Sequence, residues 1–226
     1  MQATVVLGLA VAVVDWIAVA RDQRRLEYFA KPAVMLILIA GLVLSGNILP
    51  SAIGLLFLAG LLFSLLGDIF LMLPSDRFIA GLLAFLAAHV LYVWAFNLEG
   101  LVLTLPSAAL AILVGAVAVP ILLRIRNGLK ATGRLKLWPP VAIYGVVLGA
   151  TLWSTFCTAL RPSWPVTAAA IVSVGGALFF ASDALNAWER FVFRFRGSRV
   201  LVMVTYHLAQ YALSAGVVLA IASGVG

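Results

Sequence analysis

Five ionisable side chains lie inside long apolar stretches of this sequence, and their types could support proton-transfer chemistry. They are Asp15, Asp68, His89, Asp183 and His207. An ionisable group inside a bilayer is energetically costly and usually faces a cavity or a partner. Two buried carboxyl groups can divide the roles of general acid and general base, because a shared proton is favoured over two negative charges. Asp68 and Asp183 are therefore our candidate catalytic residues.

Helical spacing places further polar side chains beside these candidates. Ser64 precedes Asp68 by four positions, and Tyr92 follows His89 by three. Residues three or four positions apart share one face of a helix. Tyr206, His207 and Gln210 form a similar group in the last apolar run of the sequence. His89 and the aromatic residues near it could equally be packing residues of a bundle, and Asp15 is expected to cap a helix or pair with the adjoining loop.

The elements that must position these residues are membrane-spanning helices. Hydrophobic residues make up 65% of the 226 positions and charged residues only 10%. A helix needs roughly 20 apolar residues to cross a bilayer. We therefore predict an all-α, polytopic integral membrane protein with one transmembrane domain over residues 1–226. Eight apolar runs define its expected helices: about 3–20, 33–49, 51–73, 78–97, 101–123, 138–159, 165–187 and 199–223.

The basic residues predict how these helices are oriented. All Lys and Arg residues except Arg161 lie in or beside alternate links of the chain, after the first, third, fifth and seventh runs. Positive residues favour the cytoplasmic side. Both termini are therefore expected on the non-cytoplasmic side, in the inner membrane if the source is bacterial. With a rise of about 1.5 Å per residue, Asp15, Asp68, Asp183 and His207 would lie about 8–12 Å from the cytoplasmic ends, around a pocket that opens inward.

Other features of the sequence bear on partners and symmetry. The concentration of basic residues in loops favours contact with anionic lipids over nucleic acid. Two histidines without metalloprotease spacing give little support for a metal, so we expect neither a metal nor a cofactor. Asp68 and Asp183 stand in similar motifs about half a chain apart, which is compatible with two four-helix halves. We expect five acids to be solvated in or beside loops: Asp22, Glu27, Asp76, Glu99 and Glu189.

Several motifs resemble those of the YhhN-like lysoplasmalogenase family. They are Lys31-Pro32, Ser64-Leu65-Leu66-Gly67-Asp68, Phe78-Ile79-Ala80-Gly81-Leu82, Ala88-His89-Val90-Leu91-Tyr92, Gly176-Ala177-Leu178-Phe179-Phe180-Ala181-Ser182-Asp183 and Thr205-Tyr206-His207-Leu208-Ala209-Gln210. Their order and spacing cover most of the chain. His207 departs from the pattern, because a second tyrosine is expected there.

The resemblance implies a membrane hydrolase that cleaves the vinyl ether of lysoplasmalogens. The products would be a fatty aldehyde and glycerophosphoethanolamine or glycerophosphocholine. Proton delivery to the alkene carbon and water attack on the resulting oxocarbenium ion would use Asp68 and Asp183, with the assignment of acid and base left open. The expected substrate-binding residues, with Lys31 or a loop arginine for the phosphate, are Lys31, Ser64, His89, Tyr92, Ser182, Tyr206, His207 and Gln210.

Three other functions remain compatible with the sequence. A proton-coupled transporter also uses intramembrane Asp and His residues, although its relay should continue into the outer half. A non-catalytic lipid-binding protein would bind lysolipid without releasing aldehyde. The same scaffold could also act on a different ether or ester lipid, because fold and motif do not fix a substrate. The oligomeric state is not indicated by the sequence.

Overall fold

The computed structural model describes residues 2–73 and 77–225, and the side chains of 4–73 and 77–225. Within these residues the regular structure is helical throughout, so the all-α prediction is confirmed. The α-helices are α1 (Gln2–Ala20), α2 (Arg24–Leu44), α3 (Ala52–Met72), α4 (Phe78–Phe96), α5 (Leu105–Ala131), α6 (Trp138–Cys157), α7 (Val166–Phe191) and α8 (Ser198–Ala222). Two short 3₁₀ turns, Leu135–Leu137 and Thr158–Leu160, flank α6.

Seven of the described helices, α2 to α8, are long and apolar enough to cross a membrane. Each satisfies its backbone hydrogen bonds internally, which a chain in hydrocarbon requires. Over its described side chains, Thr4–Ala20, α1 is apolar but shorter than these seven. The chain is thus a multi-pass membrane protein, while the eighth crossing and the division into two halves remain predictions.

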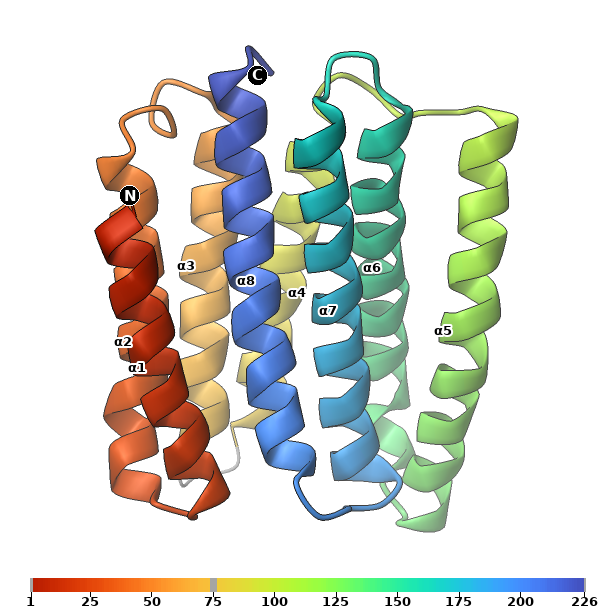
Figure 1. Ribbon diagram of the computed structural model, residues 1–226. Helices are drawn as coiled ribbons and strands as arrows, with labels where there is room; N and C mark the ends of the chain where they lie inside the picture. The colour runs from red at the N-terminus through yellow and green to blue at the C-terminus, as the bar shows by residue number, and fades with distance from the viewer. Residues whose placement is uncertain (1, 74–76, 226) are drawn as a thin grey trace.

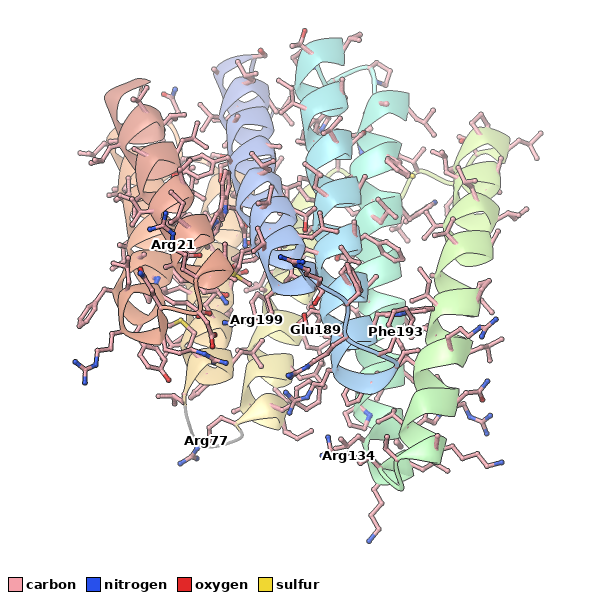
Figure 2. All side chains as sticks on the ribbon, turned by 60° about the horizontal axis from the view of Figure 1, so that its bottom comes forward. Arg21, Arg77, Arg134, Glu189, Phe193 and Arg199 are labelled. Atoms are coloured by element: carbon pink, nitrogen blue, oxygen red, sulfur yellow. The ribbon has the colours of Figure 1, made fainter. Side chains whose placement is uncertain are left out.

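The helices stand side by side as an upright bundle with both termini at the same end (Figure 1). The links after α1, α3, α5 and α7 lie at the opposite end, which we call the basic end. Arg21, Arg77, Arg134 and Arg199 are at this end, which Figure 2 turns toward the viewer. The helix α5 lies at one edge, where it contacts α6 and α7 (Figure 1). The distribution of basic side chains therefore gives the two ends of the bundle different chemistry.

The structure corrects several expected helix boundaries. The second helix begins at Arg24, so Pro32 lies inside α2 and does not open it. The fifth helix begins at Leu105 and not near residue 101, so Pro106 lies in its first turn. The seventh helix continues to Phe191 and thereby carries Arg190. At the basic end, α2 and α7 thus extend beyond their apolar runs, because their polar residues there face other helices or the aqueous end.

Two glycines of α3 allow close packing against α4. A Cβ atom at Gly60 would lie 2.4 Å from the Tyr92 ring, and one at Gly67 would lie 2.5 Å from the Phe85 ring. Such distances are shorter than van der Waals contact, so any larger residue would push these rings away. The absence of a side chain at Gly60 and Gly67 therefore fixes where α4 presents Tyr92 and Phe85.

At the basic end, two carboxylates hold Arg199 at the start of α8, one from α2 and one from the link after α1. Arg199 donates to both Glu27 oxygens at 2.9 and 2.7 Å and to Asp22 at 2.9 Å. Glu27 is buried, so the expectation that it is solvated is wrong; its pairing with Arg199 compensates the loss of water. Asp76, expected in a solvated loop, lies outside the described residues.

The proposed orientation can be tested by cysteine labelling. Cys157 is the only cysteine and is buried. In a Cys157→Ser background, Asn47→Cys at the end with the termini and Lys130→Cys at the basic end place exposed thiols on opposite sides. A membrane-impermeant maleimide should label Asn47→Cys in intact cells, and Lys130→Cys only in inverted vesicles. The reverse pattern would contradict the proposed orientation.

Candidate active site

Asp68 on α3 is the centre of one buried polar cluster. Its Oδ1 atom lies 2.9 Å from Lys31 Nζ on α2, and its Oδ2 accepts a hydrogen bond of 2.6 Å from Tyr206 Oη on α8. The side chains of Lys31 and Asp68 are only 6% and 2% exposed. Removing both charges from water is costly, and their short contact together with the tyrosine hydroxyl offsets that cost. Three helices therefore meet at this carboxylate.

Asp183 on α7 is the centre of a second polar cluster. Its Oδ2 atom contacts His89 Nε2 on α4 at 3.2 Å and accepts a short hydrogen bond from the Tyr144 hydroxyl on α6. The other ring nitrogen of His89 contacts Thr151 Oγ1 at 3.1 Å, which orients the imidazole. The Asp183 side chain is 12% exposed, so this carboxylate reaches the edge of the protein interior while Asp68 does not.

A chain of hydrogen bonds extends from the Asp68 cluster toward the middle of the bundle. Tyr206 Oη accepts from Gln210 Nε2 at 3.2 Å, and Gln210 Oε1 accepts from Tyr92 Oη at 3.4 Å. Tyr92 Oη also lies 3.3 Å from Ser64 Oγ. These four side chains, expected from helical spacing, thus form one network anchored at Asp68 and spread over three helices.

Aromatic rings lie between the two clusters. The ring of Phe179 is 4.7 Å from His89 and 5.6 Å from Tyr206, measured between ring centroids. Phe179 therefore contacts a partner of each carboxylate. Asp68 and Asp183 are near enough for their charges to interact electrostatically, although each carboxylate has its own hydrogen-bond partners. The carboxylates form two neighbouring clusters with Phe179 between their partners.

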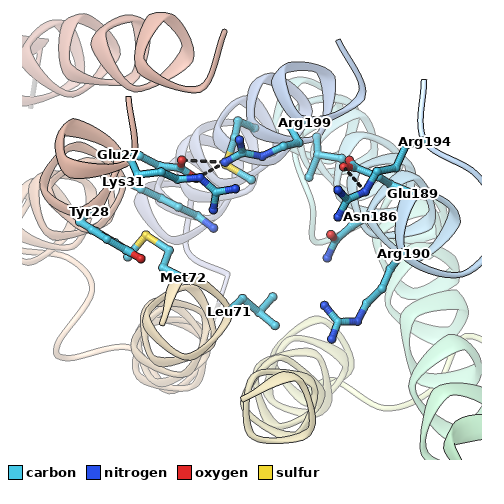
Figure 3. A pocket seen from close by; sticks show the side chains of 13 residues that line it. Glu27, Tyr28, Lys31, Leu71, Met72, Asn186, Glu189, Arg190, Arg194 and Arg199 are labelled. Carbon is cyan, nitrogen blue, oxygen red and sulfur yellow. Dashed lines mark hydrogen bonds and ion pairs between the residues drawn. The ribbon is translucent and has the colours of Figure 1, made fainter. Parts of the chain in front are cut away.

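A cavity opens at the basic end of the bundle (Figure 3). It has a volume of about 270 Å³, and Lys31 on its wall leads directly to Asp68. A smaller cavity of about 50 Å³ is lined by Asp183, Tyr144 and Phe85. Leu71, Asn186 and Arg190 line both cavities, so the charged opening and the Asp183 cluster share a wall.

Three of the residues expected to matter are placed differently. Ser182 donates to the carbonyl of Val202 at 3.0 Å and is buried against α8, which gives it a packing role. His207 accepts a hydrogen bond of 3.0 Å from Trp16 Nε1, so it faces α1. Asp15 neither caps a helix nor pairs with a loop: its carboxylate oxygens are buried without hydrogen-bond partners among the described residues.

Tyr144 and Thr151 belong to the Asp183 cluster but were not expected from the sequence. Both lie on α6, seven positions apart and therefore on one face of that helix. Their only sequence signal is a hydroxyl group within an apolar helix, which does not reveal the helix that it contacts. Among the residues that the structure describes, no three His, Cys, Asp or Glu side chains are grouped to bind a metal ion.

The fold and the site define a class of protein: a polytopic helical membrane protein with two separately partnered carboxylates, one buried and one partly exposed, beside a polar cavity. The sequence profile of the YhhN family matches residues 26–217, which include every residue of the two clusters. The chain belongs to the YhhN family, as its motifs predicted.

Individual homologous proteins provide a second comparison. The human protein named lysoplasmalogenase TMEM86B is 31% identical over 151 residues, covering 67% of this chain and 58% of its own length. Human lysoplasmalogenase TMEM86A is 36% identical over 165 residues, covering 69% and 63%. The pig TMEM86B protein is 32% identical over 164 residues, covering 70% and 61%. The chain thus matches about three fifths of the length of these relatives, and no solved structure matches it.

The Lys31–Asp68 contact predicts an asymmetric effect on stability. Lys31→Met should destabilise the protein by about 3–5 kcal/mol, because it leaves the Asp68 charge buried without its cation. Asp68→Asn in the same chain should restore part of that loss by removing the charge. Thermal unfolding in detergent measures both effects, with exposed Lys130→Met as the matched control. Equal stability of Lys31→Met and Lys130→Met would show that the pair is not energetically important.

Proposed function

We propose that this protein hydrolyses the vinyl ether of lysoplasmalogens, giving a fatty aldehyde and glycerophosphoethanolamine or glycerophosphocholine. The observation that carries the proposal is the pair of carboxylates, buried Asp68 and partly exposed Asp183, beside a large cavity rich in basic residues and a smaller, mostly apolar cavity that share a wall. Two such cavities suit a substrate with one apolar chain and one phosphate. The names of the relatives in the YhhN family supply the substrate class.

Asp183 is the better placed proton donor. It is the more exposed of the two carboxyl groups and lines the smaller cavity, so a bound alkene can reach it. His89 and Tyr144 hold its Oδ2 atom, which leaves Oδ1 to face the substrate. Transfer of the Asp183 proton to the alkene carbon produces an oxocarbenium ion, and the carboxylate left behind stabilises that positive charge.

Asp68 completes the reaction in this proposal. Water adds to the oxocarbenium carbon and gives its proton to the Asp68 cluster, where Lys31 and Tyr206 hold the carboxylate in place. The resulting hemiacetal collapses: its hydroxyl gives up a proton, the bond between its carbon and the glycerol oxygen breaks, that oxygen takes up a proton, and the aldehyde forms. Asp68 then releases the proton that it gained and Asp183 takes one up from solvent, so the site returns to its starting state without an oxidant or a cofactor.

The alkenyl chain has an apolar route from Asp183 to the lipid. A narrow cavity of about 40 Å³ between α5, α6 and α7 is lined by Asp183 and Tyr144 and otherwise by apolar or small side chains such as Leu122 and Ala184. Because α5 lies at the edge of the bundle and few of its side chains are buried, a displacement of α5 would widen this cavity (Figure 1). A chain placed here would leave its ether beside Asp183.

Substituting the two carboxyl groups tests the reaction. Asp68→Asn and Asp183→Asn should each reduce aldehyde release from a synthetic lysoplasmalogen to the background level, because an amide neither donates nor accepts the required proton. The purified variants should remain folded by thermal unfolding. Asp15→Asn is the matched control, since it removes a buried aspartate that lies in neither cluster, and it should retain most activity. Near-wild-type turnover by either cluster variant would refute the two-carboxylate mechanism.

Narrowing the apolar cavity tests the position of the chain. Ala184→Leu adds bulk to the wall between α5 and α7 and should reduce turnover of long-chain substrates more than that of short-chain ones. Ala170→Leu places the same side chain at an exposed position of α7 and serves as the control. The ratio of kcat/KM values for long and short chains is the measurement. An unchanged ratio in Ala184→Leu would place the chain elsewhere.

A further inference from the structure

The wall shared by the two cavities carries one basic residue. Five basic residues line the large cavity: Arg24, Lys31, Arg190, Arg194 and Arg199. Of the described residues that line the smaller cavity at Asp183, Arg190 alone is basic. Asn186 also lines both cavities. A ligand that extends from the charged opening to Asp183 must therefore pass both Asn186 and Arg190.

Helix α7 places Asp183, Asn186 and Arg190 in a row. They occupy positions i, i+3 and i+7, which lie on one face of a helix. Seven residues correspond to a rise of about 10 Å along the axis. Asp183 and Arg190 both line the smaller cavity, so a ligand in that cavity can span this rise. A glycerol unit that joins a phosphate to an ether can meet both side chains.

Carboxylates hold several basic residues of the large cavity in place. Arg199 binds Glu27 and Asp22, as described above, and Lys31 binds Asp68. Arg194 lies 3.5 Å from Glu189 at the rim, with an 81% exposed side chain. Figure 3 shows two of these pairs, Glu27–Arg199 and Glu189–Arg194, at the opening, and the guanidinium of Arg190 on the side of the opening where Leu71 lies.

The contacts of Arg190 suit anion binding. Its guanidinium carbon lies 4.2 Å from the centroid of the Phe78 ring, an arrangement in which the flat face of the group packs on an aromatic ring. The five N–H donors of a guanidinium lie in its plane, so they point away from a ring on which its face is stacked and can form paired hydrogen bonds to phosphate oxygens. Phe78 thus holds Arg190 at the wall shared by both cavities.

From this geometry, and resting on the proposed hydrolase function, we infer that Arg190 binds the substrate phosphate and sets its distance from Asp183. Asn186 supplies a second donor along the same face. The ligand class is a glycerophospholipid with one chain, in which phosphate bound at Arg190 places the glycerol ether at Asp183. Arg190 therefore selects substrates by the spacing between phosphate and ether, and the chemical step stays with the carboxyl groups.

The test compares two substrates that share the vinyl ether. One is a lysoplasmalogen, and the other is the corresponding alkenylglycerol, which lacks the phosphate. In Arg190→Gln the KM for the lysoplasmalogen should rise about tenfold or more, while kcat/KM for the alkenylglycerol should change by less than about twofold. Arg190→Lys keeps the charge without the planar pair of donors, so it should restore part of the affinity.

Matched variants separate this role from a structural one. Arg124→Gln removes an exposed arginine of α5 that lines neither cavity and should leave both substrates unaffected. If Arg190→Gln does not fold, Asn186→Ala should show a smaller loss confined to the lysoplasmalogen. Equal losses on both substrates, or no loss in Arg190→Gln, would overturn the assignment. A wild-type protein that releases no aldehyde from a lysoplasmalogen would instead refute the proposed function itself.

Discussion

The need to partner buried carboxylates governs this structure. A carboxylate in an apolar bundle is tolerated only with hydrogen bonds or a counter-charge. Asp68 obtains Lys31 from α2 and Tyr206 from α8, whereas Asp183 obtains His89 from α4 and Tyr144 from α6. All of these partners come from other helices, so the positions of α2, α4, α6 and α8 around the two carboxylates follow from this requirement.

The partnering is reciprocal between two helix hairpins. Asp68 and His89 belong to α3 and α4, and Asp183 and Tyr206 belong to α7 and α8; each aspartate bonds to a residue of the other hairpin. This exchange is what a repeated pair of hairpins facing each other would produce, although the repeat remains a prediction. For the proposed chemistry, it keeps two carboxylates near each other while Phe179 separates their partners, so each can perform its own proton transfer.

Much of this arrangement could be predicted from the sequence, for identifiable reasons. Apolar length identifies spanning helices, and the rarity of acids within them singles out Asp68 and Asp183. Tertiary contacts are not encoded in such patterns. Hydropathy placed the start of the second helix too late, because buried Lys31 resembles a loop residue until its contact with Asp68 is known. The partnership of Tyr144 with Asp183 and of His207 with Trp16 depends on how α6 and α1 pack, which spacing along one helix does not reveal.

Proton delivery to carbon is the central claim, and one measurement addresses it directly. The purified protein is incubated with a lysoplasmalogen in deuterium oxide, and the released aldehyde is reduced at once to limit exchange. If a carboxyl group protonates the alkene, mass spectrometry will find deuterium on the carbon next to the one that carried the aldehyde oxygen. This labelled product should form far faster with the protein than without it. Absence of protein-dependent aldehyde, or aldehyde that carries no deuterium at that carbon, would contradict the account.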